Sequence, residues 1–369
     1  MNTLLLIQKF RALNKTLLLL MLALSVFGVY AIYSATYWHE NSTFWISQIR
    51  WLFICLPVFF VVSFNDYRWV RYGAIPLYLL SVMLLILVFF IGIKVSGARS
   101  WLNLGFGSFQ PSQLAIFAGV LIFAVFLNEY HGLHPTLRIL VCLGLTAVPC
   151  ALILIQPYLG GTLVWIPVLF VMLYLAGIQK RYLLAMGLMG LMALPIMYFF
   201  GMKEYQQKRI TSFLDPASDA KDSGWNILQS LNAIGSAGLW GKGFKAPNTL
   251  NALGYIPKTI SHTDFVFTVF GEQHGFVGTS ILIATFAIML LLGLYIASQS
   301  RDPLGRLLAT GIVILLFTHI FMNIGMTVAI TPITGLPLPL VSYGGTFLLI
   351  MMACFGILQS IWIHRKPLV

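Results

Sequence analysis

Residues 73–94 read GAIPLYLLSVMLLILVFFIGIK, an apolar run whose only charged residue is the last, Lys94. A helix needs about 20 mainly apolar residues to cross the hydrocarbon core of a bilayer, so this run predicts a transmembrane helix. Similar runs recur along the whole chain, and they are too long for the alternating strands of a membrane β-barrel. The sequence predicts about ten transmembrane helices, near residues 13–35, 45–63, 73–94, 110–127, 137–155, 161–178, 183–200, 265–297, 306–330 and 344–363.

The overall composition agrees with this pattern. Hydrophobic residues make up 59% of the chain, charged residues make up 9%, and the mean hydropathy is +0.90. Soluble domains, by contrast, are about a quarter charged. The four cysteines lie in apolar runs without CxxC spacing, which is typical of small buried side chains rather than of disulfides or metal ligands. We therefore expect an all-α, polytopic helical membrane protein in which residues 1–369 form a single integral membrane domain.

The net charge is +12, and the positions of the basic residues agree with the predicted topology. One set of short loops on the ten-helix map holds most of the basic residues, namely Lys9, Arg11, Lys15, Arg68, Arg71, Arg138, Lys180, Arg181, Arg301, Arg306, Arg365 and Lys366. The opposite set holds only Arg50, Lys94 and Arg99. Because basic residues in short loops mark the cytoplasmic side, both termini of this multi-pass protein are predicted to be cytoplasmic. The distribution of basic residues thus indicates how the chain is oriented in the cytoplasmic (inner) membrane, in contact with membrane lipids. It does not indicate a nucleic-acid partner.

One long polar stretch interrupts the apolar pattern between the seventh and eighth predicted helices. It forms a large extracytoplasmic loop over residues 201–264 on this map. Six of the ten acidic residues of the chain lie between 201 and 275: Glu204, Asp215, Asp219, Asp222, Asp264 and Glu272. The segment from Lys203 to Arg209 is predicted to extend the seventh helix outward by a turn or two. Residues 225–239 have near-helical apolar spacing, so we expect a helix there at the membrane surface or against the bundle.

Asp264 lies where this polar stretch becomes apolar again, in the segment SHTDFVF at residues 261–267. A carboxylate at the mouth of a membrane protein is costly to bury more deeply and commonly has a function. The residues alone leave two interpretations open. Asp264 is either a general base in an outward-facing cavity, beside His262 and nearby cations, or the N-cap of the helix that follows.

Four cations of the loop suit an anionic substrate, because arginine and lysine both bind phosphate oxygens. They are Lys208, Arg209, Lys242 and Lys245. A solvated basic face or contact with anionic lipid headgroups would explain the same residues, so this alternative also stays open.

Two further outward loops have unusual chemistry. One contains Arg99-Ser100-Trp101 and then Gln110-Pro111-Ser112, at the start of the fourth predicted helix. The other runs from Thr331 to Thr346, includes Ser342, and has three prolines and three glycines that forbid a continuous helix. Non-helical backbone at membrane depth survives only when it is buried in protein or lines a cavity. We therefore predict that the three loops converge on one cavity.

Several of these segments, in this order, resemble the SEDS (shape, elongation, division, sporulation) family of membrane proteins. The matching motifs are RI at 209–210 with FLDP at 213–216, GWNILQS at 224–230, AIGS at 233–236, GLWGKG at 238–243, HTDF at 262–265, QPS at 110–112, NIGM at 323–326 and PITGLPLPLVSYGG at 332–345. The resemblance is collinear over nearly the whole chain. The short C-terminal tail, with Ser360 and His364-Arg365-Lys366, is more similar to the rod-shape (RodA-like) branch than to the division branch.

The resemblance implies a peptidoglycan glycosyltransferase that polymerises lipid II outside the cytoplasmic membrane during cell elongation. It implies Asp264 as the base on the acceptor 4-hydroxyl and undecaprenyl diphosphate as the leaving group. The expected partners are a class B penicillin-binding protein (a transpeptidase) and the elongation machinery. No metal-ligand set or certain cofactor is predicted, although Mg²⁺ or Mn²⁺ on the diphosphate would suit the chemistry. The expected substrate-binding residues are Arg209, Lys242, His262, Arg99, Gln110, Ser342 and Arg50.

A few positions depart from the family pattern. Gln113 and Ile116 stand where the family has a glutamate and a lysine, so both halves of an ion pair are absent together. Tyr158 stands where the family has an aspartate. Two other functions therefore stay open beside the polymerase: a lipid II flippase, and a non-catalytic scaffold for the penicillin-binding protein.

Overall fold

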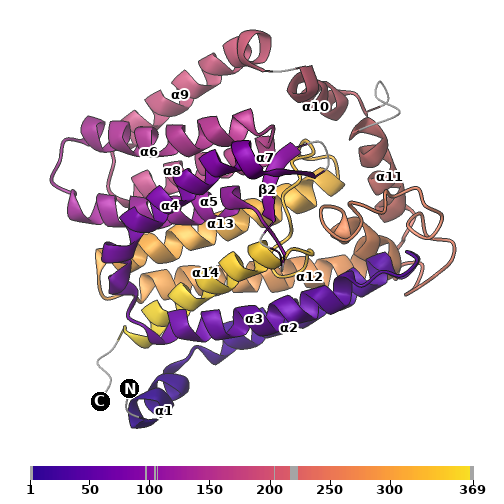
Figure 1. Cartoon of the computed structure of the whole chain (residues 1–369), viewed down its shortest axis with the longest axis horizontal. Coiled ribbons are helices and arrows are strands. Elements are labelled where there is room, and N and C mark those ends of the chain that lie inside the picture. The colour runs from indigo at the N-terminus through magenta and orange to yellow at the C-terminus, as the bar shows by residue number, and fades with distance from the viewer. Residues whose placement is uncertain are drawn as a thin grey trace.

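The computed structural model describes residues 3–95, 98–103, 105, 107–202, 204–216 and 223–365. The chain is a layered bundle of helices that run side by side, with a small sheet and the long loop at one end (Figure 1). The helices and strands are α1 (Thr3–Ala12), α2 (Lys15–Thr36), α3 (Phe44–Phe64), η1 (Tyr67–Trp69), α4 (Val70–Ile91), β1 (Ile93–Val95), β2 (Ala98–Asn103), β3 (Ser108–Phe109), α5 (Pro111–Glu129), α6 (Pro135–Ile155), α7 (Leu159–Leu163), α8 (Trp165–Leu175), α9 (Lys180–Ile196), η2 (Met197–Gly201), α10 (Glu204–Leu214), α11 (Ser223–Gly235), α12 (Val266–Ser298), α13 (Pro303–Thr327) and α14 (Gly345–Ile363).

The prediction of a polytopic helical membrane protein is confirmed. Within the described residues, nine helices are long and apolar enough to cross a bilayer. The remaining predicted span is the shorter apolar segment Leu159–Leu175, which comprises α7 and α8. Each of the ten predicted ranges therefore corresponds to an apolar helix or helix pair.

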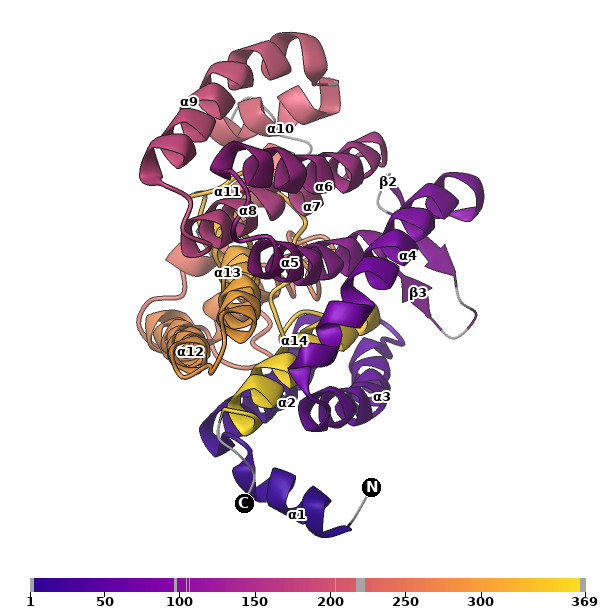
Figure 2. The same cartoon turned by 90° about the vertical axis from the view of Figure 1, so that its left-hand side faces the viewer.

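Three of these helices form the centre of the bundle. In α5 and α14, 83% of the most apolar window is buried inside the protein, and in α13 the share is 72%. In α9 the share is only 6%, and Figure 2 shows α9 at the outer edge, away from α5, α13 and α14. The outward side chains of α9 remain apolar, as expected for a helix that faces lipid rather than water.

Helix α12 consists of two pieces, as its length of 33 residues suggests. Gly275 interrupts the helical backbone with φ 66° and ψ −161°, a conformation that strongly favours glycine. A Cβ on Gly275 would also collide with the backbone of Leu239 and Gly241, which pass directly against it. The first piece, residues 266–274, is therefore a short helix clamped by the long loop.

The long loop contains two helices of its own. The seventh span ends in the π-helical turn η2, and the backbone is then extended at Met202 before α10 begins at Glu204. The prediction that residues 203–209 extend the seventh helix is therefore wrong. The extended backbone at Met202 ends that helix, and α10 is a separate helix. Helix α11 confirms a helix in the expected range 225–239, although it ends at Gly235 and turns follow. It packs on the bundle through Ser230, whose hydroxyl lies 2.6 Å from the Thr268 hydroxyl and donates to the Thr327 carbonyl at 2.6 Å.

A three-stranded antiparallel sheet, in the order β1-β2-β3, joins α4 to α5. Leu102 pairs with Phe109 in its second ladder. The all-α prediction did not include this small sheet. Helix α1 and the end of α14, the described elements that lead to the two termini, lie at the opposite end of the bundle from β2 and α11 (Figure 1).

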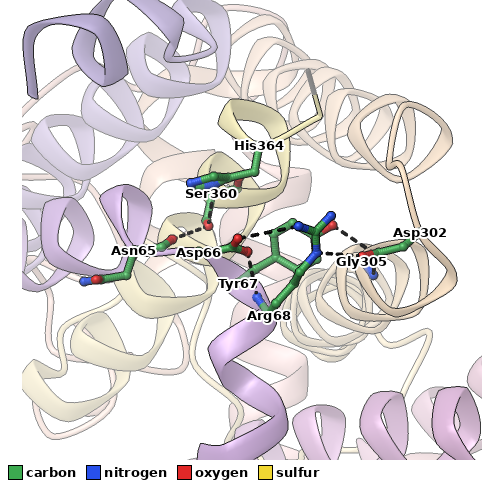
Figure 3. Close-up of polar contacts among 8 residues, drawn as sticks. All are labelled: Asn65, Asp66, Tyr67, Arg68, Asp302, Gly305, Ser360 and His364. Atoms are coloured by element: carbon green, nitrogen blue, oxygen red, sulfur yellow. Dashed lines mark hydrogen bonds and ion pairs between the residues drawn. The ribbon is translucent and has the colours of Figure 1, made fainter. Parts of the chain in front are cut away.

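A polar cluster ties the helix ends together near the termini (Figure 3). Arg68 Nε donates to Asp302 Oδ2 at 3.0 Å, and the Tyr67 hydroxyl donates to Asp302 Oδ1 at 2.9 Å. Asp302 also caps α13, because its carboxylate accepts from the Gly305 amide at 2.8 Å. The Ser360 hydroxyl donates to the Asn65 carbonyl at 2.5 Å, so α14 joins the same cluster.

Candidate active site

Asp264 lines a cavity of about 210 Å³ at the end of the bundle that lies away from the termini. All three unusual loops contribute to it, as the sequence predicts. Strand β2 supplies Ser100 and Trp101, and the N-cap of α5 supplies Gln110. The loop before α14 and the first turn of α14 supply residues between 334 and 347. Arg209, from α10, completes the wall. Residues more than 200 positions apart in the sequence thus surround one carboxyl group.

The backbone around Asp264 is held from two sides. The side-chain amide of Asn323, on α13, donates to the Asp264 carbonyl at 3.0 Å. The Ser342 hydroxyl donates to the Thr263 carbonyl at 2.5 Å, and the Tyr343 amide donates to the His262 carbonyl at 3.0 Å. These bonds join the start of α12 to the loop before α14, so the position of the carboxyl is determined by buried backbone.

The alternative interpretation of Asp264 as a helix cap is wrong. Helix α12 begins at Val266, its N-cap residue is Phe265, and no side chain caps it. The carboxyl is therefore not used to satisfy the amides of its own helix.

Burial sets the acidity of this carboxyl. It raises the pKa of Asp264 to about 6, while the Arg209 charge and a hydrogen bond from Thr263 act in the opposite direction. A carboxyl with this pKa is mostly ionised at neutral pH yet remains a better proton acceptor than an exposed aspartate. The arrangement has the properties of a general base.

Tyr158 and Gly335 complete the wall beside this carboxyl. Gln113 Nε2 donates to the Tyr158 hydroxyl at 3.3 Å, and that hydroxyl lies 3.4 Å from the Gly335 carbonyl, to which it donates. Gly335 has φ +67°, and a Cβ at this position would be 3.5 Å from Asp264 Oδ2. The positive φ disfavours a larger residue, so glycine keeps backbone close to the carboxylate.

A larger cavity of about 870 Å³ adjoins the first and shares Trp101, Thr259, Thr263 and Tyr343 with it. Arg50 and Lys258 line it together with a set of aromatic side chains. The set comprises Phe44, Trp51, Trp101 and Tyr343. The volume lies within the range of roughly 300–1,000 Å³ that is typical of ligand pockets.

His262 lies in the wall of this larger cavity. Its ring stacks on Phe44 with centroids 4.1 Å apart. Burial, followed by the charge of His39, lowers the pKa of His262 to about 4, so the ring is neutral at physiological pH. The His262 ring therefore contributes a neutral aromatic wall to the cavity and not a positive charge.

Three of the expected substrate-binding residues do not line either cavity. Lys242 Nζ pairs with Glu272 Oε1 at 2.7 Å, and the Glu272 side chain is fully buried. Arg99 is exposed and donates to the Phe89 carbonyl at 3.1 Å. Ser342 is buried and serves as the backbone clamp described above. By contrast, Asp264, Arg209 and Gln110 line the small cavity, and Arg50 and His262 line the large one.

The structure adds Asn323, Tyr343, Trp101 and Lys258 to the site, none of which the sequence predicted as site residues. Asn323 and Tyr343 lie inside the family motifs, and these motifs could have identified them as site residues. Trp101 and Lys258 carry no such signal on their own, because an aromatic residue in a strand and a loop lysine are common in any protein. In the described part of the chain, no group of three or more His, Cys, Asp or Glu side chains gathers as a metal site. A divalent cation would therefore need Asp264 together with oxygens of a substrate.

Comparison with known proteins assigns this chain to a family. Residues 12–367 match the model of the cell cycle protein family that comprises FtsW, RodA and SpoVE. The chain is 38% identical over 358 residues to peptidoglycan glycosyltransferase MrdB of Escherichia coli (strain K12), covering 96% of this chain and 95% of that protein. It is 34% identical over 377 residues to a probable peptidoglycan glycosyltransferase FtsW of Geobacter sulfurreducens, covering 99% of both. This chain belongs to the FtsW/RodA/SpoVE family, which is the SEDS family.

Solved structures agree with this assignment. A chain in a peptidoglycan synthase complex, described as coordinating polymerization and crosslinking, superposes with a TM-score of 0.81 at 30% identity, covering 96% of this chain and 98% of that one. The rod shape determining protein RodA of Thermus thermophilus superposes with a TM-score of 0.68 at 28% identity, covering 96% and 98%. The fold and the family resemblance inferred from the motifs are both confirmed.

Proposed function

We propose that this chain is a peptidoglycan glycosyltransferase that polymerises lipid II into glycan strands at the outer face of the cytoplasmic membrane during cell elongation. The relatives named as peptidoglycan glycosyltransferases support the reaction class. The observation that carries the mechanism is Asp264, a carboxyl with a pKa of about 6 inside a cavity built by three loops.

In this mechanism Asp264 accepts the proton of the acceptor sugar's 4-hydroxyl. The hydroxyl oxygen attacks the anomeric carbon of the donor, a new glycosidic bond forms, and the bond to the diphosphate breaks. Undecaprenyl diphosphate leaves with the bonding electrons, and the anomeric configuration inverts. One carboxyl is sufficient for this role, because the lipid diphosphate is already a good leaving group and needs charge stabilisation rather than a proton.

Positive charge for the leaving diphosphate is available in the adjoining cavities. Arg209 lines the small cavity, and Arg50 and Lys258 line the large one. Preorganised cations stabilise charge that develops in the transition state more than they stabilise the ground state. The aromatic walls of the large cavity suit the sugar faces and the first isoprene units of the lipid, since both present C–H surfaces.

The orientation follows from the positive-inside rule. Both termini are cytoplasmic in this assignment, so the Asp264 cavity faces outward, where lipid II is polymerised. A class B penicillin-binding protein is the proposed partner that crosslinks the product. The structural neighbour in a complex that joins polymerization to crosslinking supports this pairing.

The test is polymerisation of purified lipid II by the wild-type protein, by Asp264→Asn and by Glu129→Gln, each with and without the penicillin-binding protein and a divalent cation. Glu129 is an exposed carboxylate at the other end of α5, so its change to an amide is the matched control. We expect no glycan strands from Asp264→Asn and wild-type activity from Glu129→Gln. Normal strand formation by Asp264→Asn would rule out the proposed base.

A folding control belongs to the same experiment. The pKa of Asp264 is raised in the folded protein, so folding favours its protonated form, and its ionisation lowers stability as the pH rises through about 6. At pH 8, Asp264→Asn should therefore be at least as thermally stable as the wild type. Lipid II translocation by reconstituted protein would instead support the flippase. Absence of polymer from wild type with its partner, while Asp264→Asn still supports cell shape, would support the scaffold.

A further inference from the structure

A third cavity, of about 450 Å³, lies at the end of the bundle that holds the termini, and the proposed chemistry does not use it. It opens between the ends of α5 and α8 and the first turns of α13. Its polar lining residues are Asn128, His131 and Arg306. Its apolar lining residues are Leu127, Leu175, Ala176, Pro303 and Leu307. The cavity therefore combines a basic lining with apolar walls.

The carboxylate of Asp302, which caps α13, is already neutralised by its partners. The Asp302 carboxylate accepts from Arg68, Tyr67 and the Gly305 amide, as Figure 3 shows. Asp66 also contacts Arg68, at 3.7 Å. Arg306 lies one turn further along α13, is exposed, and forms no ion pair within 4.0 Å in the described part of the chain. The positive charge of its guanidinium group at the cavity is therefore not offset by a carboxylate of the described residues.

A second arginine adds positive charge behind the wall. Arg138 is only 5% exposed, and its guanidinium donates to the carbonyls of Ala176 at 2.9 Å and of Leu127 and His131 at 3.5 Å. All three of these residues line the cavity. Its Nε has no hydrogen-bond partner, and no carboxylate of the described residues pairs with it. A buried cation without a counter-charge is costly, so an anion in the adjacent cavity would offset this cost.

We propose that this cavity binds the phosphate headgroup of an anionic phospholipid from the leaflet at the termini end, which is the inner leaflet in the orientation proposed above. Arg306 contacts the phosphate through its planar fork, and Arg138 stabilises the charge from behind the wall. Basic pockets between transmembrane helices on the cytoplasmic side are suited to anionic headgroups.

The surroundings favour a lipid over a soluble phosphate compound. Leu175, in the cavity lining, and Tyr174 beside it are exposed apolar side chains of α8. Helix α6, which carries Arg138, also has exposed apolar side chains at Leu137 and Leu140. These side chains can contact acyl chains while the headgroup occupies the basic end of the cavity. A soluble phosphate compound would occupy the basic end of the cavity without contacting that apolar surface.

The experiment titrates delipidated full-length protein in detergent with dioleoylphosphatidylglycerol and, separately, with dioleoylphosphatidylcholine, and counts bound lipids by native mass spectrometry. Wild type and Arg306→Gln are compared with Arg301→Gln, which changes an exposed arginine of the α12–α13 connection that does not line the cavity. We expect one phosphatidylglycerol to bind in preference to phosphatidylcholine. Arg306→Gln should weaken it about tenfold, and Arg301→Gln should not weaken it.

Three results would overturn the proposal: equal binding by Arg306→Gln and wild type, equal loss in Arg301→Gln, or no preference for the anionic lipid. Inorganic phosphate and glycerol 1-phosphate are added as competitors. Displacement of phosphatidylglycerol at comparable concentrations would assign the cavity to a soluble phosphate compound instead. As a second measurement, Arg138→Met should reduce the increase in melting temperature that phosphatidylglycerol produces. None of these readouts depends on polymerisation, so the proposal and the proposed function can fail independently.

Discussion

The side-chain amide of Asn323 donates to the backbone carbonyl of Asp264 at 3.0 Å and to that of Leu336 at 2.7 Å. One fully buried side chain of α13 thus connects Asp264, two residues before α12, to the irregular loop before α14. The proposed base and the loop that covers it are positioned by the same amide.

Replacement of Asn323 by alanine should therefore lower activity without a change at the carboxyl itself. The buried Leu336 carbonyl and the partly buried Asp264 carbonyl lose their donor, and an unsatisfied buried group costs about 1–3 kcal/mol. We expect a lower melting temperature and a turnover rate reduced about 10- to 100-fold. Asn232→Ala, on the exposed face of α11, is the control and should behave as wild type. Unchanged turnover by Asn323→Ala would show that this amide does not position Asp264.

The pH dependence should report the Asp264 carboxyl. Because its pKa is about 6, polymerisation should decline as the pH falls through 6. The positive charge of Arg209 lowers this pKa, so Arg209→Gln should shift the acidic limb of the pH–rate profile to higher pH. Lys208→Gln changes the neighbouring cation, which does not line the small cavity, and should leave the limb in place. A limb that moves to lower pH in Arg209→Gln would contradict the assignment.

Tyr158→Phe tests the wall beside the carboxyl. The change removes the hydroxyl that accepts from Gln113 and leaves that buried amide without its partner. The turnover rate should fall severalfold because the wall loosens, whereas the acidic limb should stay near pH 6, since the Tyr158 hydroxyl is bonded to Gln113 and Gly335 and not to the Asp264 carboxyl. A pH–rate profile measured for both proteins separates these effects. A shifted limb would mean that the phenol acts directly on the base.

The pair between Lys242 and Glu272 should stabilise the clamp on the first piece of α12. Glu272 Oε1 accepts from Lys242 Nζ and from the Leu250 amide, both at 2.7 Å. Lys242→Met leaves the buried carboxylate without a counter-charge, which costs about 3–5 kcal/mol. The double variant Lys242→Met/Glu272→Gln should melt at a higher temperature than Lys242→Met alone. Equal melting temperatures for the two variants would show that the unpaired Glu272 carboxylate does not destabilise the fold.

Much of this architecture could be predicted from the sequence, because apolar runs of membrane-spanning length are a local property. The ten spans and the helix near residues 225–239 follow from composition and spacing. The small sheet and the separate helix α10 could not be predicted, since single backbone angles, such as the extended conformation of Met202, decide where an element starts.

The candidate site divides in the same way. The residue types and motifs in the sequence indicated Asp264, Arg209, Gln110, His262 and Arg50, and these line the two cavities. Lys242 could not be separated from them in the sequence, because a lysine next to two glycines has the same appearance whether it meets a substrate or a buried glutamate. Its partner is 30 residues away, and only the folded chain brings the two together.

The sequence by itself determined that this chain is a multi-pass helical membrane protein of the FtsW/RodA/SpoVE family. Hydropathy and motif order depend only on which residues follow one another, so they do not require the folded structure. The tertiary structure alone decided that Asp264 does not cap its helix, that burial raises its pKa, and that Asn323 and Tyr158 are its neighbours. These properties depend on distances and burial between segments far apart in the chain, and such distances exist only after the helices have packed.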